Sequence, residues 1–400
     1  MRYIAIAALA SAALVGGPSV APTPVDSPAG PGAGEPSLAA APNGDVYLSW
    51  LEPSDSGHAL RFARYDGTGW SAPRTIREGR DFFVNWADFP SMEVLGGGEN
   101  RLAAHWLQRA GAGTYAYHVK LALSNDGGAT WSQPITPHVD TSNTEHGFVA
   151  LWREGDALGA AWLDGRKYNK EGHDPSNEMT VRSTMIASNG RRGAEVLLDG
   201  RACDCCQTSA AVTSDGPIVV YRDRSPEEIR DIYVVRRVGG KWTDPAAIHD
   251  DGWKINACPV NGPAVDARGA GVAVAWFTAA HNNPQVKVAF SSDAGASFGA
   301  PVRLDGGAPA GRVDLALLPD GSALVSWIER TGGDTAAVQS RRVMPNGKAS
   351  APITIAASSA ARASGFPRMA VSRDYVLFAW TQPGRPSAVK LSRLSFAELR

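Results

Sequence analysis

Short runs of alternating hydrophobic and polar residues follow one another along most of the chain, and turn residues separate them. A recurring unit consists of a short apolar run, a turn that contains glycine, and a second run that usually ends in tryptophan. Residues 36–39 and 46–50 form one such pair, and residues 263–265 and 272–276 form another. An alternation with a period of two residues is typical of half-buried β-strands. The pattern therefore predicts antiparallel hairpins of short strands.

This pair of runs is a repeat. Its seven copies are 50 to 61 residues apart and begin at Pro36, Pro90, Phe148, Ser209, Pro263, Val313 and Pro367. Most copies continue with a third and a fourth run, such as residues 60–65 and 70–76. Four short antiparallel strands in ~50 residues are typical of a β-propeller blade. We predict an all-β fold, a β-propeller of four-stranded antiparallel blades over residues 36–396. Seven blades are expected, and six blades with an extra half-unit are the alternative.

The two ends of the chain differ from the repeat. Residues 1–20 contain Arg2 and then an apolar run over residues 4–15, a pattern typical of a secretion signal. An uncleaved apolar N-terminus is the alternative. Residues 21–35 are rich in proline, glycine and alanine and are interpreted as a linker. Because the seventh unit ends near Phe396 after three runs, we expect this linker to supply the missing outer strand. The predicted localisation is export, to the periplasm or the extracellular space.

Composition narrows the classes of function. The formal net charge is −1, and no basic run is present, which argues against a nucleic-acid partner. Glycine and proline account for 43 and 27 of 400 residues, which leaves little room for long helices. No segment after residue 20 approaches the ~18 continuous apolar residues of a membrane helix, so no membrane span is expected.

Two turns have the same sequence pattern. Residues 124–131 and 291–298 both read S-x-D-x-G-x-[ST]-[WF], which is the Asp-box. In such a turn the aspartate accepts backbone hydrogen bonds and glycine supplies a positive φ. Because both Asp-boxes fall within blades of the counted repeat, the chain resembles the sialidase and BNR-repeat propellers over nearly all of residues 36–396. The resemblance implies that Asp126 and Asp293 are structural and lie on the face opposite the active site.

The loops of the other face carry most of the reactive side chains, and concave loop-lined faces are the usual place for binding. The resemblance implies a glycosidase that needs arginines for a substrate carboxylate, a carboxylic acid as proton donor and a tyrosine–glutamate pair as nucleophile. The predicted catalytic residues are Asp88, Asp164, Tyr168 and Glu228, with Glu145 as the alternative partner of the tyrosine. The predicted substrate-binding residues are Arg166, Arg222, Arg224 and Arg368.

The chain departs from that family in two respects. The Arg-Ile-Pro signature is absent, and the comparable phrases are residues 89–91, Phe-Pro-Ser, and residues 366–368, Phe-Pro-Arg. The family has six blades, whereas seven are counted here. The alternative interpretation is therefore that the charged rim residues form ion pairs that hold loop ends together.

Four cysteines form the sharpest local feature. Cys203, Cys205 and Cys206 precede the fourth blade, and Cys258 occupies the equivalent connector of the next blade. The thiols are therefore expected to meet. In an exported protein disulfides are the first expectation, although C-x-C-C is a poor spacing for two unstrained bridges. Soft thiolates also suit Cu(I) or Zn(II), and a poised pair suits thiol exchange.

The histidines and tryptophans carry weaker signals. His118 falls within a strand-like run, and His138 is expected on a loop surface. His146, His173 and His281 lie on the predicted rim and are the candidates for binding. The tryptophans that end the second runs recur with the blade period, so we expect them in the core rather than in contact with a sugar.

Two hypotheses of different class follow. The first is an exported sialidase-like propeller that binds an acidic glycan or small-molecule ligand on its rim and, if active, acts as an exo-α-sialidase-like hydrolase without a cofactor. The second is a non-enzymatic periplasmic propeller. Its cysteine cluster would bind copper or zinc, or would staple a surface on which a protein partner docks.

Overall fold

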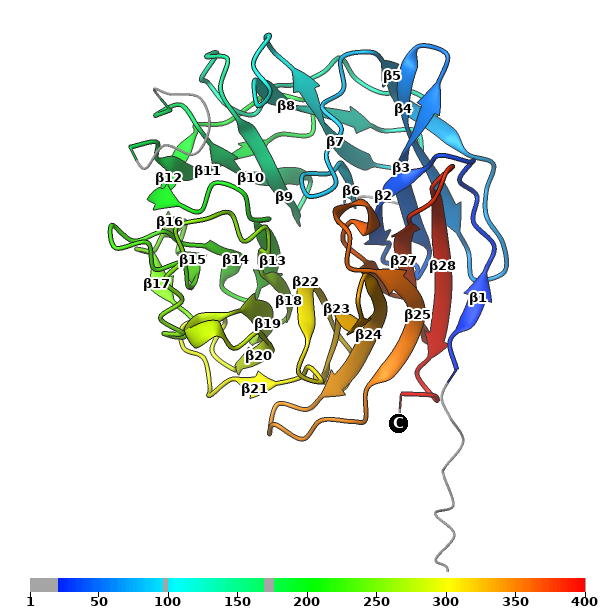
Figure 1. Cartoon of the computed structure of the whole chain (residues 1–400). Coiled ribbons are helices and arrows are strands. Elements are labelled where there is room, and N and C mark those ends of the chain that lie inside the picture. Colours follow the sequence, from blue (N-terminus) through cyan, green and yellow to red (C-terminus); the bar gives the residue numbers. More distant parts are fainter. Residues whose placement is uncertain (1–20, 96–99, 169–175, 400) are drawn as a thin grey trace, which may run out of the picture.

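The computed structural model describes residues 21–95, 100–168 and 176–399, and these residues form seven small sheets around one axis (Figure 1). Among the described residues, only two short 3-10 turns interrupt the strands, η1 (Ala280–Asn282) and η2 (Arg362–Ser364). The prediction of an all-β propeller with seven blades is confirmed, and the six-blade alternative is wrong. The predicted secretion signal lies outside the described residues. Within those residues, no helix is both long and apolar enough to cross a membrane.

Each blade follows the chain outward from the axis and is numbered here in chain order. The innermost strands are β2 (Gly34–Ala40), β6 (Ser91–Val94), β9 (His146–Glu154), β13 (Ser209–Thr213), β18 (Ala264–Arg268), β22 (Pro309–Leu317) and β26 (Arg368–Val371). The second strands are β3 (Val46–Ser54), β7 (Leu102–Arg109), β10 (Ala157–Asp164), β14 (Gly216–Arg222), β19 (Gly271–Thr278), β23 (Ala323–Gly332) and β27 (Tyr375–Gln382). The third strands are β4 (Gly57–Tyr65), β8 (Tyr117–Ser124), β11 (Met179–Ile186), β15 (Ile232–Val238), β20 (Gln285–Ser291), β24 (Thr335–Val343) and β28 (Ala388–Ser395).

The outer strands are less regular. They are β5 (Arg74–Gly79), β12 (Val196–Ala202), the pair β16 (Lys241–Trp242) and β17 (Ala246–Ala247), β21 (Val302–Arg303) and β25 (Ile353–Ser359). In blade two a single bridge between Leu121 and Ile135 stands in the place of an outer strand. In blade seven the outer strand is β1 (Thr23–Val25), which pairs antiparallel with β28 (Figure 1). The first and last parts of the described chain therefore share one sheet, which closes the ring.

The second strands are buried on both faces because neighbouring blades cover them. Trp50, Trp162, Trp276 and Trp327 are among the largest fully buried side chains, as expected for core positions. Three of these indoles donate to a carboxylate two residues further along the same strand: Trp50 to Glu52, Trp162 to Asp164 and Trp327 to Glu329. Residues two apart lie on the same side of a strand, so the acid satisfies the buried N–H.

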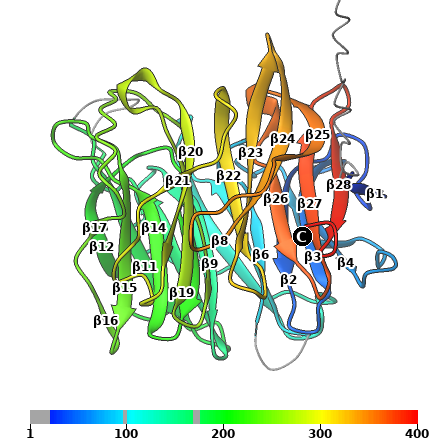
Figure 2. The same ribbon diagram turned by 90° about the horizontal axis from the view of Figure 1, so that it is seen from below.

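The innermost strands line a central channel of about 1010 Å³. The strands run between the two ends of this channel (Figure 2). Because neighbouring strands of a blade are antiparallel, the connections after second strands and after third strands lie at opposite ends. The turns at residues 124–131 and 291–298 follow third strands, so they lie at the end opposite the loops that follow second strands. Asp126 and Asp293 each accept a backbone N–H within these turns, from Thr130 and Ser297. The candidate functional residues lie at the other end of the channel.

Candidate functional site

A buried tyrosine joins two carboxyl groups at the loop end of blades two and three. Tyr117 begins β8, Asp88 lies in the connector before β6, and Glu145 directly precedes β9. The Tyr117 hydroxyl is 2.8 Å from Asp88 Oδ2 and 2.8 Å from Glu145 Oε1. Gly147 makes room for this contact, because a Cβ at that position would lie 2.0 Å from Asp88 Oδ2.

This cluster holds a proton at neutral pH. Burial raises the pKa of Asp88 to about 7 and raises the pKa of Glu145 well above its usual range. The Tyr117 hydroxyl has one proton and can donate it to only one of the two carboxyl groups. The second short contact is a hydrogen bond only when the other carboxyl group is protonated and donates to the tyrosine. The arrangement can therefore deliver or accept a proton near neutral pH.

Asp88 and Glu145 were predicted site residues, and the tyrosine that the structure places between them is Tyr117 rather than the predicted Tyr168. The predicted Tyr168 is partly buried beside the cysteine cluster. Burial, and then the negative charges of Asp204 and Glu145, raise the pKa of Tyr168, so its hydroxyl stays neutral. Tyr117 is the first residue of a strand, and in the alternating pattern it resembles a core residue. The sequence around it therefore gives no sign of a functional role.

Asp164 has a structural role that its repeat position explains. It accepts the Trp162 indole N–H at 2.9 Å and two hydrogen bonds from Arg166, at 2.6 and 2.7 Å. Burial alone would raise the pKa of Asp164, but the bonds from Arg166 and the nearby His146 outweigh it and lower the pKa to about 2. Asp164 therefore does not suit the role of proton donor. Arg166 also contacts Glu195 at 2.8 Å, which leaves it poorly placed for a substrate carboxylate.

Arg222 binds backbone rather than ligand. Its guanidinium is buried and donates to the carbonyl oxygens of Asn261, Arg230 and Phe277. It also lies over the Trp253 ring at 4.7 Å. Arg222 thus ties blade four to strand β19 of blade five and to the connector before that blade, so its donors are engaged by the protein itself.

Arg224 and Glu228, both predicted site residues, bind each other. Arg224 Nη2 lies 2.7 Å from Glu228 Oε1, and Arg230 reaches the same carboxylate at 2.9 Å. Burial alone would raise the pKa of Glu228, but the hydrogen bonds from Arg224 and Arg230 lower it. These contacts fit the alternative interpretation, in which ion pairs hold loop ends. Of the four predicted arginines, Arg368 alone lines the channel, where it lies 3.5 Å from Asp314.

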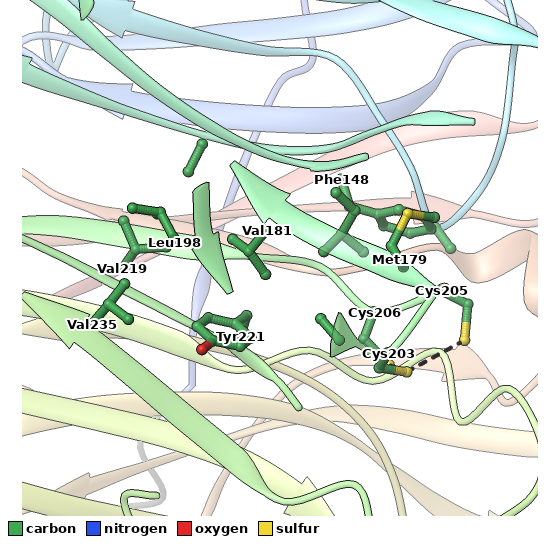
Figure 3. Close-up of a cluster of buried hydrophobic side chains, with 14 of the residues drawn as sticks. Phe148, Met179, Val181, Leu198, Cys203, Cys205, Cys206, Val219, Tyr221 and Val235 are labelled. Atoms are coloured by element: carbon green, nitrogen blue, oxygen red, sulfur yellow. Dashed lines mark hydrogen bonds between the residues drawn. The ribbon is translucent and has the colours of Figure 1, made fainter. Parts of the chain in front are cut away.

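The four cysteines meet, as expected from their equivalent connectors. Cys203 Sγ lies 3.1 Å from Cys206 Sγ and 3.8 Å from Cys205 Sγ, at one end of the apolar cluster between blades three and four (Figure 3). Cys258 Sγ lies 3.7 Å from Asp204 Oδ1. Two overlapping sets each have their ligand atoms within 4.8 Å of one another: Cys203, Cys205 and Cys206, and Asp204, Cys205 and Cys258. The structure describes all four cysteines and shows no disulfide among them.

The surroundings of the thiols favour one thiolate. Burial raises the pKa of Cys203 to about 12. At Cys206 burial is outweighed by hydrogen bonds from the two neighbouring thiols and by the charge of Arg222, which together lower its pKa. Arg230 Nη1 is 3.3 Å from Cys203 Sγ. Two buried guanidinium groups therefore lie beside the thiols and favour negative charge on sulfur.

Solved structures with a similar fold include a sialidase, an arabinanase and an arabinofuranosidase. One is the Trypanosoma rangeli sialidase in complex with 2,3-difluorosialic acid, with 16% identity, a TM-score of 0.52, and coverage of 91% of this chain and 60% of that chain. Another is the Penicillium chrysogenum α-L-arabinanase complexed with arabinobiose, with 13% identity, a TM-score of 0.51, and coverage of 96% and 98%. A third is the Fusarium graminearum α-L-arabinofuranosidase with an iminosugar inhibitor, with 13% identity, a TM-score of 0.51, and coverage of 95% and 98%.

These likenesses concern the fold. No protein-family model matches the sequence, and no curated protein matches it. At identities of 13 to 16% the agreement shows a shared architecture, a β-propeller. The resemblance to sialidase-type propellers inferred from the repeats is confirmed at that level. The chain spans 60% of the length of the sialidase it matches.

Proposed function

We propose that this protein is an exported propeller that binds Cu(I) through Cys203, Cys205, Cys206 and Cys258. The observation that carries the proposal is that the Sγ atoms of Cys203, Cys205 and Cys206 lie within 4.8 Å of one another, while Cys258 from the next blade connector lies equally close to Cys205 and Asp204. Thiolates are soft ligands that favour Cu(I), and they also bind Zn(II). Three close sulfur atoms suit the low coordination number of Cu(I). Tetrahedral Zn(II) would also need Cys258 or Asp204.

The charges around the cluster fit this function. A Cu(I) ion with two or three thiolates carries a net negative charge, which the buried Arg222 and Arg230 offset. The lowered pKa of Cys206 favours the first thiolate, and the metal displaces protons from the other thiols. In an oxidising compartment, a bound metal would also keep these cysteines from forming disulfides.

The test is an anaerobic Cu(I) titration of the reduced chain in competition with a chromogenic chelator. We expect one Cu(I) per chain. Cys203→Ser and Cys206→Ser should each weaken binding by about 100-fold or more, while His281→Ala on the rim leaves it unchanged. A weaker effect of Cys258→Ser on Cu(I) than on Zn(II) would fit three-sulfur coordination. The proposal fails if protein isolated from the periplasm has no free thiols and no metal, because the cysteines are then disulfide-bonded.

Export itself is tested by cell fractionation and N-terminal sequencing. We expect the mature chain in the periplasm or the medium, without the apolar run over residues 4–15. A cytoplasmic chain that retains this run would contradict export and would also remove the need to protect the thiols from oxidation. Docking of a protein partner on the same face stays a prediction.

A second candidate function is hydrolysis of a glycoside at the mouth of the channel, and the Asp88–Tyr117–Glu145 cluster favours it. The pKa of Asp88, raised by burial to about 7, suits a general acid. Arg368 in the channel is the available partner for an acidic glycan. The test is fluorescence release from 4-methylumbelliferyl sialoside and arabinofuranoside. Turnover that Asp88→Asn and Tyr117→Phe both reduce at least about 100-fold would support this function, and turnover no higher than the blank would reject it.

A further inference from the structure

Three histidines converge between blades two and three, away from the thiols. His118 lies on β8, His138 lies in the segment between β8 and β9, and His146 begins β9. One ring nitrogen from each lies within 4.8 Å of the other two. The His138 and His146 rings stack with centroids 4.0 Å apart. His138, expected on a loop surface, is in fact 2% exposed, because the segment that carries it folds inward over β8.

Two of these rings have a buried nitrogen without a partner, and at His138 that nitrogen carries a lone pair. His138 Nδ1 lies 2.7 Å from the carbonyl oxygen of Asp140. A carbonyl only accepts, so Nδ1 carries the proton and Nε2 of the neutral ring has a free lone pair. Among the described residues, that Nε2 is buried without a partner, and so is His118 Nδ1. Burial lowers the pKa of His138 to about 3 and of His118 to about 4, so both rings are neutral at physiological pH.

Carboxylates complete the set. His146 Nε2 is 3.0 Å from Asp140 Oδ2 and 3.7 Å from Asp164 Oδ2. Its Nδ1 faces the Thr144 carbonyl at 3.2 Å and therefore serves as a donor. A cation, either a proton or a metal ion, is thus needed between His146 Nε2 and the carboxylates. Asp164 is engaged by Trp162 and Arg166, whereas Asp140 Oδ2 accepts only the Ser142 hydroxyl besides its contact with His146, so Asp140 is the carboxylate more available to a metal.

The nearby basic side chains do not supply the cation that is needed between His146 Nε2 and the carboxylates. Lys120 donates to Thr136 Oγ1 at 2.7 Å, and burial lowers the pKa of Lys120. Arg166 is held by Asp164 and Glu195. Neither Lys120 nor Arg166 is therefore free to neutralise the Asp140 carboxylate, which contacts the histidine cluster through His146.

We propose that His118, His138 and His146, with Asp140 as the fourth ligand, bind a divalent transition-metal ion of the Zn(II) or Cu(II) class. Imidazole and carboxylate are ligands that suit these ions rather than Cu(I). Nitrogens within 4.8 Å of one another need only small side-chain movements to reach the ~2.0–2.1 Å of a zinc–nitrogen bond. The Asp140 carbonyl fixes the tautomer of His138 from behind, as outer partners of metal-bound histidines commonly do. This site is independent of the thiol site.

The experiment uses the full chain after its thiols have been blocked by alkylation, so that failure of the Cu(I) proposal does not affect it. We expect one Zn(II) per chain in competition with a chromogenic indicator, and tighter binding of Cu(II). His118→Ala should weaken both at least about 100-fold, and His58→Ala on β4 of blade one should not. His118 is partly exposed, so its loss is expected to leave the fold intact.

Electron paramagnetic resonance of the Cu(II) form supplies a second readout. Hyperfine coupling to imidazole nitrogen is expected in the unmodified chain and should be reduced in His118→Ala and His138→Gln. The proposal is overturned if alkylated protein binds neither ion. It is also overturned if His118→Ala binds as tightly as the unmodified chain, or if the bound Cu(II) lacks nitrogen coupling.

Discussion

Buried carboxyl groups of this propeller exist in opposite protonation states, and their immediate neighbours decide which. Asp164 receives hydrogen bonds from Arg166 and Trp162, and its pKa falls to about 2. Asp88 receives a hydroxyl and one backbone N–H but no cation, and burial raises its pKa to about 7. The difference separates a carboxylate that holds a blade together from one that can carry a proton.

Asp88 makes stability depend on pH. Its pKa in the folded chain lies above the ordinary aspartate value of 3.8, so the folded state binds the proton more tightly than the unfolded state. The associated stability is fully present below about pH 4 and is lost as the pH rises through about 7. Asp88→Asn should therefore flatten the decline in unfolding free energy between pH 4 and 8, by at most ~1.4 kcal/mol per pH unit.

Calorimetry or urea unfolding across this range measures the effect. Asp164→Asn is the matched control: it should leave the slope between pH 4 and 8 unchanged, because the lowered pKa of Asp164 places its own titration at lower pH. Equal slopes for the unmodified chain and Asp88→Asn would show that Asp88 does not hold the proton.

At the scale of the strand, the recurring element is a tryptophan followed two residues later by an acceptor. Glu52, Asp164 and Glu329 occupy this position in blades one, three and six, and Gln382 occupies it in blade seven. The acid satisfies an indole N–H that would otherwise be buried without a partner. The repeated strand pattern thus accounts for the presence of Asp164, whereas its position beside the rim loops suggested a catalytic role.

Removal of this acceptor should destabilise the blade. Glu329→Ala leaves the Trp327 N–H, 2.6 Å from Glu329 Oε2 in the native chain, without its acceptor, with an expected loss of ~1–3 kcal/mol of unfolding free energy. Glu329→Gln retains an acceptor and should lose less. A double-mutant cycle with Trp327→Phe measures the coupling by chemical denaturation. Additive effects in this cycle would contradict the proposed role of the pair.

The whole molecule depends on a ring closed by both ends of the described chain. Val25 of β1 lies opposite Leu391 of β28, and the Trp70 indole donates to the Asp26 carbonyl oxygen at 2.8 Å. Without β1, the outer edge of β28 would be unpaired, and an unpaired strand edge is a site of self-association.

Deletion of β1 should therefore lower stability. A chain that begins at residue 31 is expected to lose ~1–3 kcal/mol, the scale of a few hydrogen bonds, and to self-associate with increasing concentration. A chain that begins at residue 21 retains β1 and serves as the control. Tm measurements and analytical ultracentrifugation compare the two, and identical behaviour would mean that blade seven is stable with three strands.

The sequence by itself determined the architecture. Alternating runs, turn residues and the tryptophan period are local signals that each blade repeats, so the number of blades, the innermost strands and the face of the rim loops could all be predicted. The meeting of the four cysteines also followed, because equivalent connectors of neighbouring blades must lie side by side.

Only the tertiary structure decided which side chains at the rim act together. Arg222 donates to carbonyl oxygens 39 and 55 residues away, and Tyr117 contacts carboxyl groups 28 and 29 residues away. His118, His138 and His146 converge from two blades and the segment between them. Long polar side chains find partners according to how adjacent blades pack, and neither periodicity nor local spacing records that packing.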